Sequence, residues 1–66
     1  MSPERFAMKL KKLREARGLT QEELATKAGL SRAYVARLET GRHDPHLSRL
    51  RALAKILRVK VSQLVD

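Results

Sequence analysis

The sequence contains no cysteine and no tryptophan, and its only aromatic residues are Phe6 and Tyr34. Without cysteine, neither a disulfide framework nor a thiolate metal site is available. The scarcity of aromatic rings counts against proteins that bind RNA or single strands by stacking bases on them. No apolar run approaches the roughly 18–20 residues that span a membrane. These absences exclude a disulfide scaffold and count against a membrane-spanning segment.

The sequence also lacks a secretion signal and a good set of metal ligands. Residues 1–12 alternate charged and apolar side chains, without the apolar centre of a signal peptide. His43 and His46 lie three positions apart beside Asp44, and this set has no further partner for a metal. We therefore expect a cytoplasmic, nucleoid-associated protein that holds no metal and no cofactor.

Basic residues are what the chain has in excess. Fifteen Lys and Arg stand against seven Asp and Glu, which gives a net charge of +8 in 66 residues. This excess indicates a polyanionic partner, with nucleic acid first and an anionic membrane surface second. The length allows one domain, residues 1–66, with a small core, because such a chain buries only about 60% of its unfolded surface. With little room for a pocket and no nucleophile–base pair or phosphate loop, we expect no enzyme activity.

One segment, TQEELATKAGLSRAYVARLETG, predicts two short helices joined by a tight turn. The first helix opens with a T-x-x-E capping box at Thr20 and Glu23 and ends at Gly29. The second is capped by Ser31 and stopped by Gly41. Such a pair is typical of a helix-turn-helix, whose second helix fits the DNA major groove. By spacing alone, a hairpin in any small helical bundle explains the segment equally well, and the basic composition favours the DNA-binding interpretation.

Helical patterns continue on both sides of this segment. A first helix begins at Ser2 and Pro3 and is stopped by Gly18. Residues 41–45 form a loop, a fourth helix follows, and a short last turn covers residues 61–65. No strand is expected, so the predicted fold class is all-α, a compact bundle of five short helices. The apolar series of the fourth helix is Leu47, Leu50, Leu53, Ala54 and Leu57.

The two-helix segment, followed by P-x-L-x-x-L-x-x-L-A, resembles the lambda-repressor-like (Cro/C1-type, XRE family) helix-turn-helix domains. Ala25, Gly29 and Val35 stand at that motif's usual places for a small residue, a glycine and a branched residue. The SRAYV stretch is also similar to controller proteins of restriction–modification systems. The resemblance implies a small transcriptional regulator that binds double-stranded operator DNA. Its recognition helix, about Ser31–Thr40, would lie in the major groove.

Carried over position by position, the resemblance assigns residues to the DNA interface. The guanidinium groups of Arg32 and Arg37 suit guanine O6 and N7, and the small residues Ala33 and Ala36 suit a thymine methyl. Gln21 matches a glutamine that touches a phosphate, a role that free N–H groups at a helix start support. The matched base contacts are Arg32, Ala33, Ala36 and Arg37, and the matched phosphate contacts are Gln21, Ser31, Tyr34, Thr40 and Arg42.

Simpler alternatives stay open for several of these positions. Arg32 is also suited to a phosphate contact, Arg37 to a plain surface position and Tyr34 to packing. Arg14 and Glu39 match a pair that forms an internal salt bridge in the family, which would make both of them scaffold residues. Three further basic residues are expected to supply a diffuse field rather than defined contacts. They are Lys11, Lys12 and Arg17.

The C-terminal part departs from the family pattern. Relatives often have Ser or Thr where this chain has His46, Gly where it has Arg58, and a capping residue where it has Lys60. These departures concern the path of the last two helices and leave the helix-turn-helix motif intact.

A homodimer on a palindromic operator is expected, because one recognition helix reads too few base pairs to be specific in a genome. Val59 and Leu64 are expected to pack inward, which leaves Val61 and Val65 for an isologous interface. The alternative is that all four close the core. Other functions consistent with the sequence are an antitoxin of a toxin–antitoxin pair and a helical protein-interaction module. We expect no membrane partner and see no site for a small-molecule effector.

Overall fold

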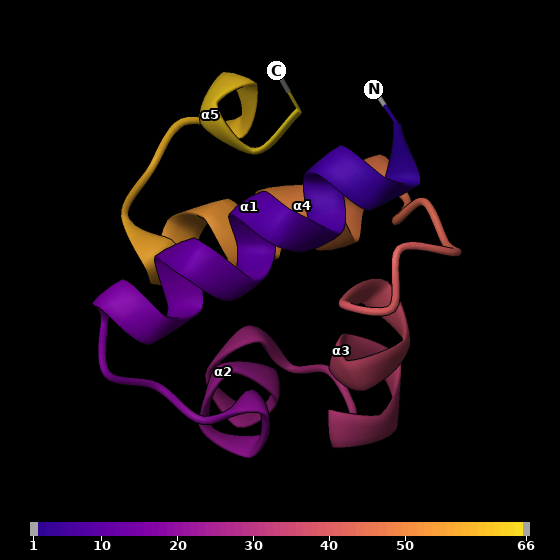
Figure 1. Cartoon of the computed structure of the whole chain (residues 1–66). Coiled ribbons are helices and arrows are strands. Elements are labelled where there is room, and N and C mark those ends of the chain that lie inside the picture. The colour runs from indigo at the N-terminus through magenta and orange to yellow at the C-terminus, as the bar shows by residue number, and fades with distance from the viewer. Residues whose placement is uncertain (1, 66) are drawn as a thin grey trace.

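The computed structural model describes residues 2–65, and this part of the chain contains five α-helices and no strand (Figure 1). The all-α prediction is therefore confirmed. The domain measures 24 × 22 × 21 Å along its principal axes. The helices are α1 (Pro3–Ala16), α2 (Gln21–Ala28), α3 (Arg32–Leu38), α4 (Leu47–Leu57) and α5 (Val61–Val65).

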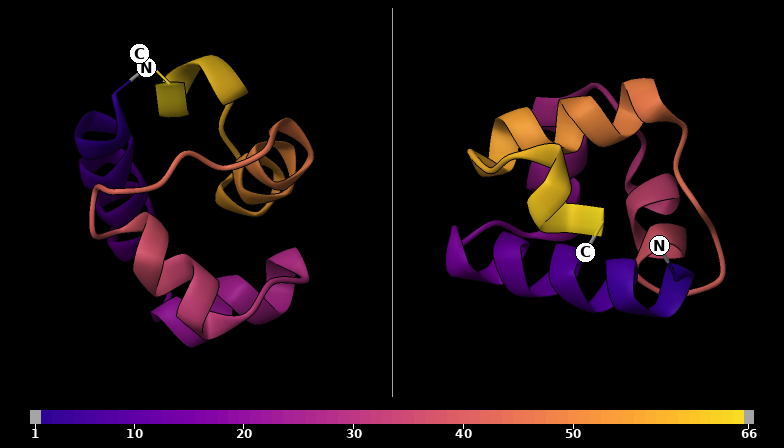
Figure 2. Two further views of the ribbon diagram at one scale, coloured as in Figure 1. Left: turned by 90° about the vertical axis from the view of Figure 1, so that its right-hand side faces the viewer. Right: turned by 90° about the horizontal axis from the view of Figure 1, so that it is seen from above.

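The helices surround one core, with α1 and α4 on opposite sides of it (Figure 2). The helix pair α2 and α3 covers one end of the domain, and α5 covers the other. Helix α2 packs against α3 and α4, whereas α5 packs against α1 and α4. Both ends of the described chain lie on the α5 side, away from α2 and α3. The α2–α3 end is therefore clear of both ends of the described chain.

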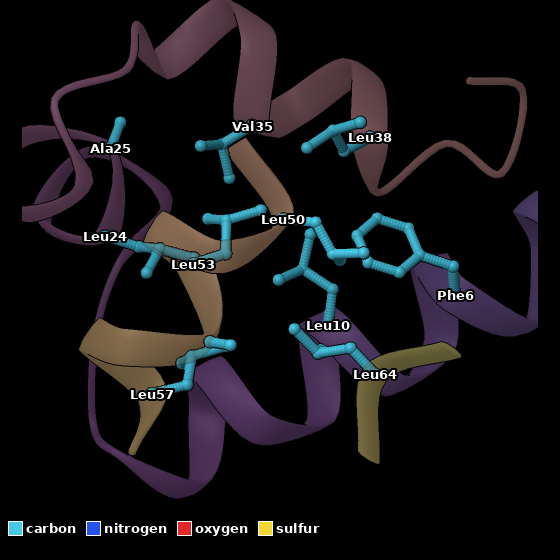
Figure 3. Close-up of a cluster of buried hydrophobic side chains, with 11 residues drawn as sticks. Phe6, Leu10, Leu24, Ala25, Val35, Leu38, Leu50, Leu53, Leu57 and Leu64 are labelled. Carbon is cyan, nitrogen blue, oxygen red and sulfur yellow. The ribbon is translucent and has the colours of Figure 1, made fainter. Parts of the chain in front are cut away.

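Every helix contributes to the apolar core (Figure 3). The predicted series of α4 is buried except for its first member, because Leu47 is 55% exposed. A helical side chain tilts toward the helix N-terminus, so the first residue extends beyond the packed part of the helix. The core residues are Phe6, Leu10, Leu24, Ala25, Val35, Leu38, Leu50, Leu53, Ala54, Leu57 and Leu64.

Helix α3 ends at Leu38, two residues before the end that the sequence predicted for the recognition helix. The Thr40 N–H donates to the Arg37 carbonyl at 3.1 Å, and the Thr40 hydroxyl donates to the same oxygen at 2.6 Å. The chain then turns at Gly41 with φ of +81°, where an added Cβ would lie 3.3 Å from the Glu4 Cα. Any other residue at this position would meet both the strain of the left-handed backbone and the close approach of α1.

The three departures from the family pattern lie at the ends of α4 and α5. The His46 side chain makes no capping hydrogen bond at the start of α4. Arg58 ends α4 in the left-handed conformation, with φ of 58°, where glycine would be unstrained. The Lys60 N–H donates to Gln63 Oε1 at 2.8 Å, which is the half of a capping box that a lysine allows. All three helix ends form, with weaker local support than usual.

Arg17 has a defined role that the sequence did not reveal. Its Nε donates to the Leu57 carbonyl at 3.1 Å and so satisfies one of the last carbonyls of α4. This contact lies within the domain, and the expectation that Arg17 supplies a diffuse field toward DNA stays a prediction. The contact joins residues 40 positions apart, which explains why no local pattern indicated it.

Candidate nucleic-acid interface

Local hydrogen bonds fix both ends of α2, including the turn that leads into α3. At the start of α2, the Glu23 N–H donates to Thr20 Oγ1 at 3.0 Å and the Thr20 N–H donates to Glu23 Oε1 at 2.8 Å, which completes the predicted capping box. At its end, the Leu30 N–H donates to the Ala25 carbonyl at 2.8 Å, with Gly29 left-handed at φ of +71°. Each end of α2 is therefore closed by the residues that the sequence indicated.

Helix α3 presents its polar side to solvent. Ser31 caps it by accepting from the Tyr34 N–H at 3.0 Å. Val35 and Leu38 are fully buried, and they turn one side of the helix toward the core. The four residues assigned to base contacts lie on the other side, three of them exposed and Ala36 half-buried; they are Arg32, Ala33, Ala36 and Arg37.

The residues assigned to phosphate contacts differ in their exposure and in the hydrogen bonds that they already make. Ser31 and Thr40 are exposed, but each hydroxyl already makes a hydrogen bond to the backbone of α3. Arg42 is exposed in the loop after α3. Tyr34 is half-buried and packs against the core, as the packing alternative expected. The guanidinium of Arg49 lies over the Tyr34 ring in a cation–π contact, with Cζ 4.8 Å from the ring centroid.

Arg49 is a basic residue near the candidate interface that the sequence analysis did not identify. It stands in the first turn of α4 and lines one hollow with two residues of α3, Tyr34 and Arg37. His43 and His46 line the same hollow, and both are exposed. No motif placed α4 beside α3, so only the tertiary structure brings these groups together. Within residues 2–65, no group of three or more acidic or histidine side chains is arranged to hold a metal.

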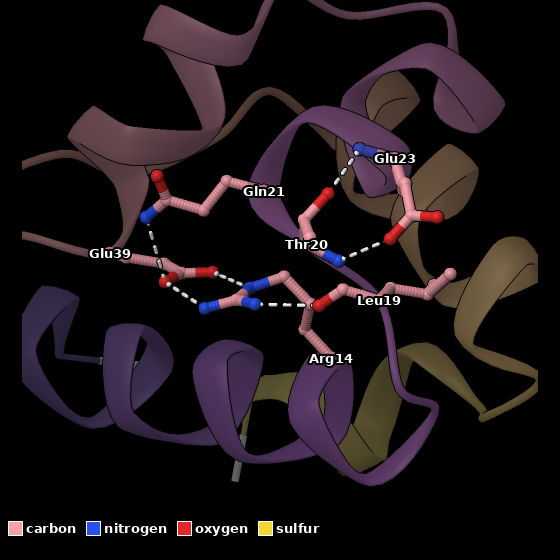
Figure 4. A network of polar contacts seen from close by, with 6 residues as sticks. All are labelled: Arg14, Leu19, Thr20, Gln21, Glu23 and Glu39. Atoms are coloured by element: carbon pink, nitrogen blue, oxygen red, sulfur yellow. Dashed lines mark hydrogen bonds and ion pairs between the residues drawn. The ribbon is translucent and has the colours of Figure 1, made fainter.

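A buried ion pair joins α1 to the end of α3 (Figure 4). Arg14 Nε donates to Glu39 Oε2 at 2.7 Å, and Arg14 Nη2 donates to Glu39 Oε1 at 3.1 Å. The remaining Arg14 nitrogen, Nη1, donates to the Leu19 carbonyl at 2.7 Å. The side chains are only 10% and 5% exposed. This bidentate pair fixes the position of α3 relative to α1 and to the turn before α2.

Gln21 joins this network. Its Nε2 donates to Glu39 Oε1 at 3.1 Å, so the residue assigned to a phosphate is also tied to the scaffold. Arg14 and Gln21 line a hollow between the starts of α2 and α3, together with Arg32. Arg14, the amide of Gln21 and Arg32, the first residue of α3, therefore line the same hollow.

Two pKa values reflect these contacts. The hydrogen bond to Glu39 raises the pKa of Arg14, although burial opposes the shift. The backbone hydrogen bond at Thr20, followed by its side-chain bond, lowers the pKa of the Glu23 carboxyl below 4.5. Both shifts favour the charged form, so the ion pair and the capping box are charged at neutral pH.

The candidate dimer residues pack partly inside the domain. Leu64 is fully buried, whereas Val59, Val61 and Val65 are all half-buried against the core. Val59 and Leu64 thus pack inward as expected, but Val61 and Val65 pack against the core to a similar degree as Val59, and their place in a dimer interface stays a prediction. Because α5 has only five residues, it cannot bury every apolar side chain around it. No helix within residues 2–65 has the length and apolar character needed to cross a membrane.

Comparisons with known proteins agree with this architecture. The sequence profile of the helix-turn-helix family HTH_3 matches residues 10–64. The immunity repressor protein of Bacillus phage phi105 is 47% identical over 57 residues, which are 86% of this chain and 40% of that repressor. An uncharacterised HTH-type transcriptional regulator of Methanocaldococcus jannaschii is 41% identical over 56 residues, 85% of each chain. The chain thus spans less than half of the phage repressor.

Solved structures share the fold over nearly the whole chain. The restriction-modification controller protein C.AhdI from Aeromonas hydrophila superposes with a TM-score of 0.90, at 37% identity and 94% coverage of both chains. SinR of Bacillus subtilis, in complex with DNA, superposes with a TM-score of 0.89 at 29% identity, covering 92% of this chain and 98% of that one. These similarities confirm the lambda-repressor-like fold and the resemblance to controller proteins.

Proposed function

This chain belongs to the HTH_3 helix-turn-helix family, and on that premise we propose that it binds double-stranded DNA sequence-specifically and regulates transcription. The observation that carries the proposal is the solvent-facing side of α3, which begins with Arg32 and includes Arg37. Local caps and the Arg14–Glu39 pair hold α3 firmly against α2 and α1. A rigid helix with an exposed basic side suits the major groove.

In the proposed complex, α3 enters the major groove with its N-terminal residues toward the base edges. Arg32 pairs with a guanine, Arg37 is the second reader, and Ala33 and Ala36 meet thymine methyl groups. The phosphate contacts come from the starts of α2 and α3 and from the loop after α3, namely Gln21, Ser31, Tyr34, Thr40 and Arg42. The structure of SinR, which shares the fold at 29% identity, was solved in complex with DNA, and this supports DNA as the partner.

The proposal is tested by selecting bound sequences from a pool of random duplexes. We expect enrichment of one palindromic site and an affinity that falls linearly with salt on a log–log plot. The expected slope is about −0.9 for each phosphate contact. An affinity independent of salt, or a selected pool that stays random, would reject DNA recognition.

We further propose that the chain acts as a homodimer, with half-sites about 34 Å apart, one turn of DNA. The proposed interface includes Val61 and Val65, the first and last residues of α5, which are both partly exposed. Val61→Glu combined with Val65→Glu should give a folded monomer that binds the operator weakly. Sedimentation measures the oligomeric state, and circular dichroism verifies the fold. A double variant that still dimerises would place the interface elsewhere; exposed Leu47 is then the next residue to change.

A further inference from the structure

The amide of Gln21 has a fixed orientation because of what lies beside it. Its nitrogen faces Glu39, 3.1 Å from Oε1, and its oxygen points away from that carboxylate (Figure 4). A carboxylate only accepts hydrogen bonds, so a flipped amide would bring two oxygen atoms together. Glu39 thus selects one of the two orientations of the Gln21 side chain.

The network also keeps Glu39 itself in place. Arg14 binds both carboxylate oxygens, and the oxygen that accepts from Gln21 also accepts from Arg14 Nη2 at 3.1 Å. A lone carboxylate near the DNA backbone would repel phosphate, whereas a carboxylate paired with an arginine is compensated. Glu39 can therefore sit beside a phosphate-binding residue with a limited electrostatic cost.

We infer that Glu39 is a positioning residue for DNA binding, which acts through Gln21. By accepting one N–H of the Gln21 amide, it fixes the orientation of this side chain at the edge of the hollow shared with Arg14 and Arg32. The second N–H is then oriented in advance for a phosphate oxygen, which lowers the entropy lost on binding. This inference rests on the proposed function, because it assigns Glu39 a role beyond joining α1 to α3.

A double-mutant cycle on operator affinity separates this role from a purely structural one. Gln21→Ala should weaken binding about tenfold in the native chain, the scale of one hydrogen bond to a charged group. In a Glu39→Ala background, which leaves no side-chain acceptor beside the Gln21 amide, the same change should weaken binding by less than about twofold. An equal loss in both backgrounds would overturn the inference.

Glu22→Gln is the matched control for charge. Glu22 lines the same hollow, is exposed, and is adjacent to Gln21 in the chain. Its replacement removes the same negative charge but leaves the Gln21–Glu39 bond intact. The roughly tenfold effect of Gln21→Ala should therefore persist in this background. If it falls there as well, the coupling reflects net charge and not orientation, and the inference is wrong.

Nuclear magnetic resonance tests the contact itself, without DNA. The chain has no asparagine and two glutamines, Gln21 and Gln63, so its side-chain amide spectrum contains two pairs of signals. Glu39→Asp keeps the charge, shortens the reach of the carboxylate and adds no new amide. We expect it to move the Gln21 pair and leave the Gln63 pair in place.

The two experiments distinguish the possible failures. An unmoved Gln21 pair would overturn the positioning role while leaving DNA binding untouched. A native chain that binds no duplex specifically would overturn the proposed function and, with it, this inference, even if the Gln21 pair moves. Glu39→Asp, whose shorter side chain draws the acceptor away from Gln21, also serves as the second background for the affinity cycle, should Glu39→Ala fail to fold.

Discussion

The helix-turn-helix and the C-terminal helices are built by different means. In the helix-turn-helix, local residues close both ends of α2 and the start of α3. They are a capping box at Thr20, a left-handed glycine at Gly29 and a serine cap at Ser31. In the C-terminal helices, His46 makes no side-chain cap and Arg58 occupies a left-handed position. Helices α4 and α5 therefore depend on burial, whereas the turn that presents α3 is also fixed locally.

This difference shows which part of the domain needs the more precise positioning. A helix that addresses base edges must be held within a fraction of an ångström, and local caps together with the Arg14–Glu39 pair would serve this purpose for α3 in the proposed complex. The far end of the domain needs only to close the core. Side chains such as Leu53, Leu57 and Leu64 do so despite unfavourable helix ends.

The largest expected effect is the loss of stability when a core side chain is removed from the C-terminal region. Leu57 is 1% exposed, and Leu57→Ala should lower the free energy of unfolding by about 2–5 kcal/mol. Ile56→Ala is the control, because the neighbouring Ile56 is only half-buried and should cost less. Urea denaturation measures both. Equal losses would show that burial is not what holds α4.

The second effect concerns the helix-turn-helix. Gly29 has φ of +71° and open space where a Cβ would stand, so Gly29→Ala adds backbone strain and no clash. It should destabilise the domain by about 1–2 kcal/mol. Thermal denaturation at neutral pH measures the loss. An unchanged melting temperature would mean that the turn does not depend on the left-handed glycine.

A smaller effect of opposite sign is expected at the corresponding position of α4. Arg58→Gly relieves a left-handed non-glycine residue and should stabilise the domain by up to about 1 kcal/mol, since added freedom of the unfolded chain offsets part of the gain. Together with Gly29→Ala, it compares the same backbone conformation in the two regions. A destabilised Arg58→Gly variant would contradict the account of this helix end.

The smallest effect is a pH dependence at the capping box. The pKa of Glu23 is lowered in the folded chain, so its contribution to stability is full above the unfolded value of about 4.5 and is lost as the pH falls through the folded value. Glu23→Gln should be less stable than the native chain at pH 7, and the two melting temperatures should converge toward pH 3. A gap that widens in acid would show that the sign is wrong.

Local sequence signals predicted the helices and the turn, because a cap and its partner lie three or four positions apart. They did not predict the contacts that depend on packing. Gln21 meets Glu39 across 18 positions, and Arg17 meets Leu57 across 40. The end of α3 was predicted two residues too late, because Thr40 turns its hydroxyl onto the backbone and tightens the last turn.

The most direct test of sequence-specific recognition by α3 compares Arg32→Ala with the native chain on two duplexes. One duplex carries the selected operator, and the other is a shuffled sequence of the same length and composition. On the operator, the variant should lose roughly 1–3 kcal/mol of binding free energy and its preference at one base pair of each half-site, while its affinity for the shuffled duplex should change little. An equal loss on both duplexes would make Arg32 a phosphate contact and contradict the assignment of base reading to α3.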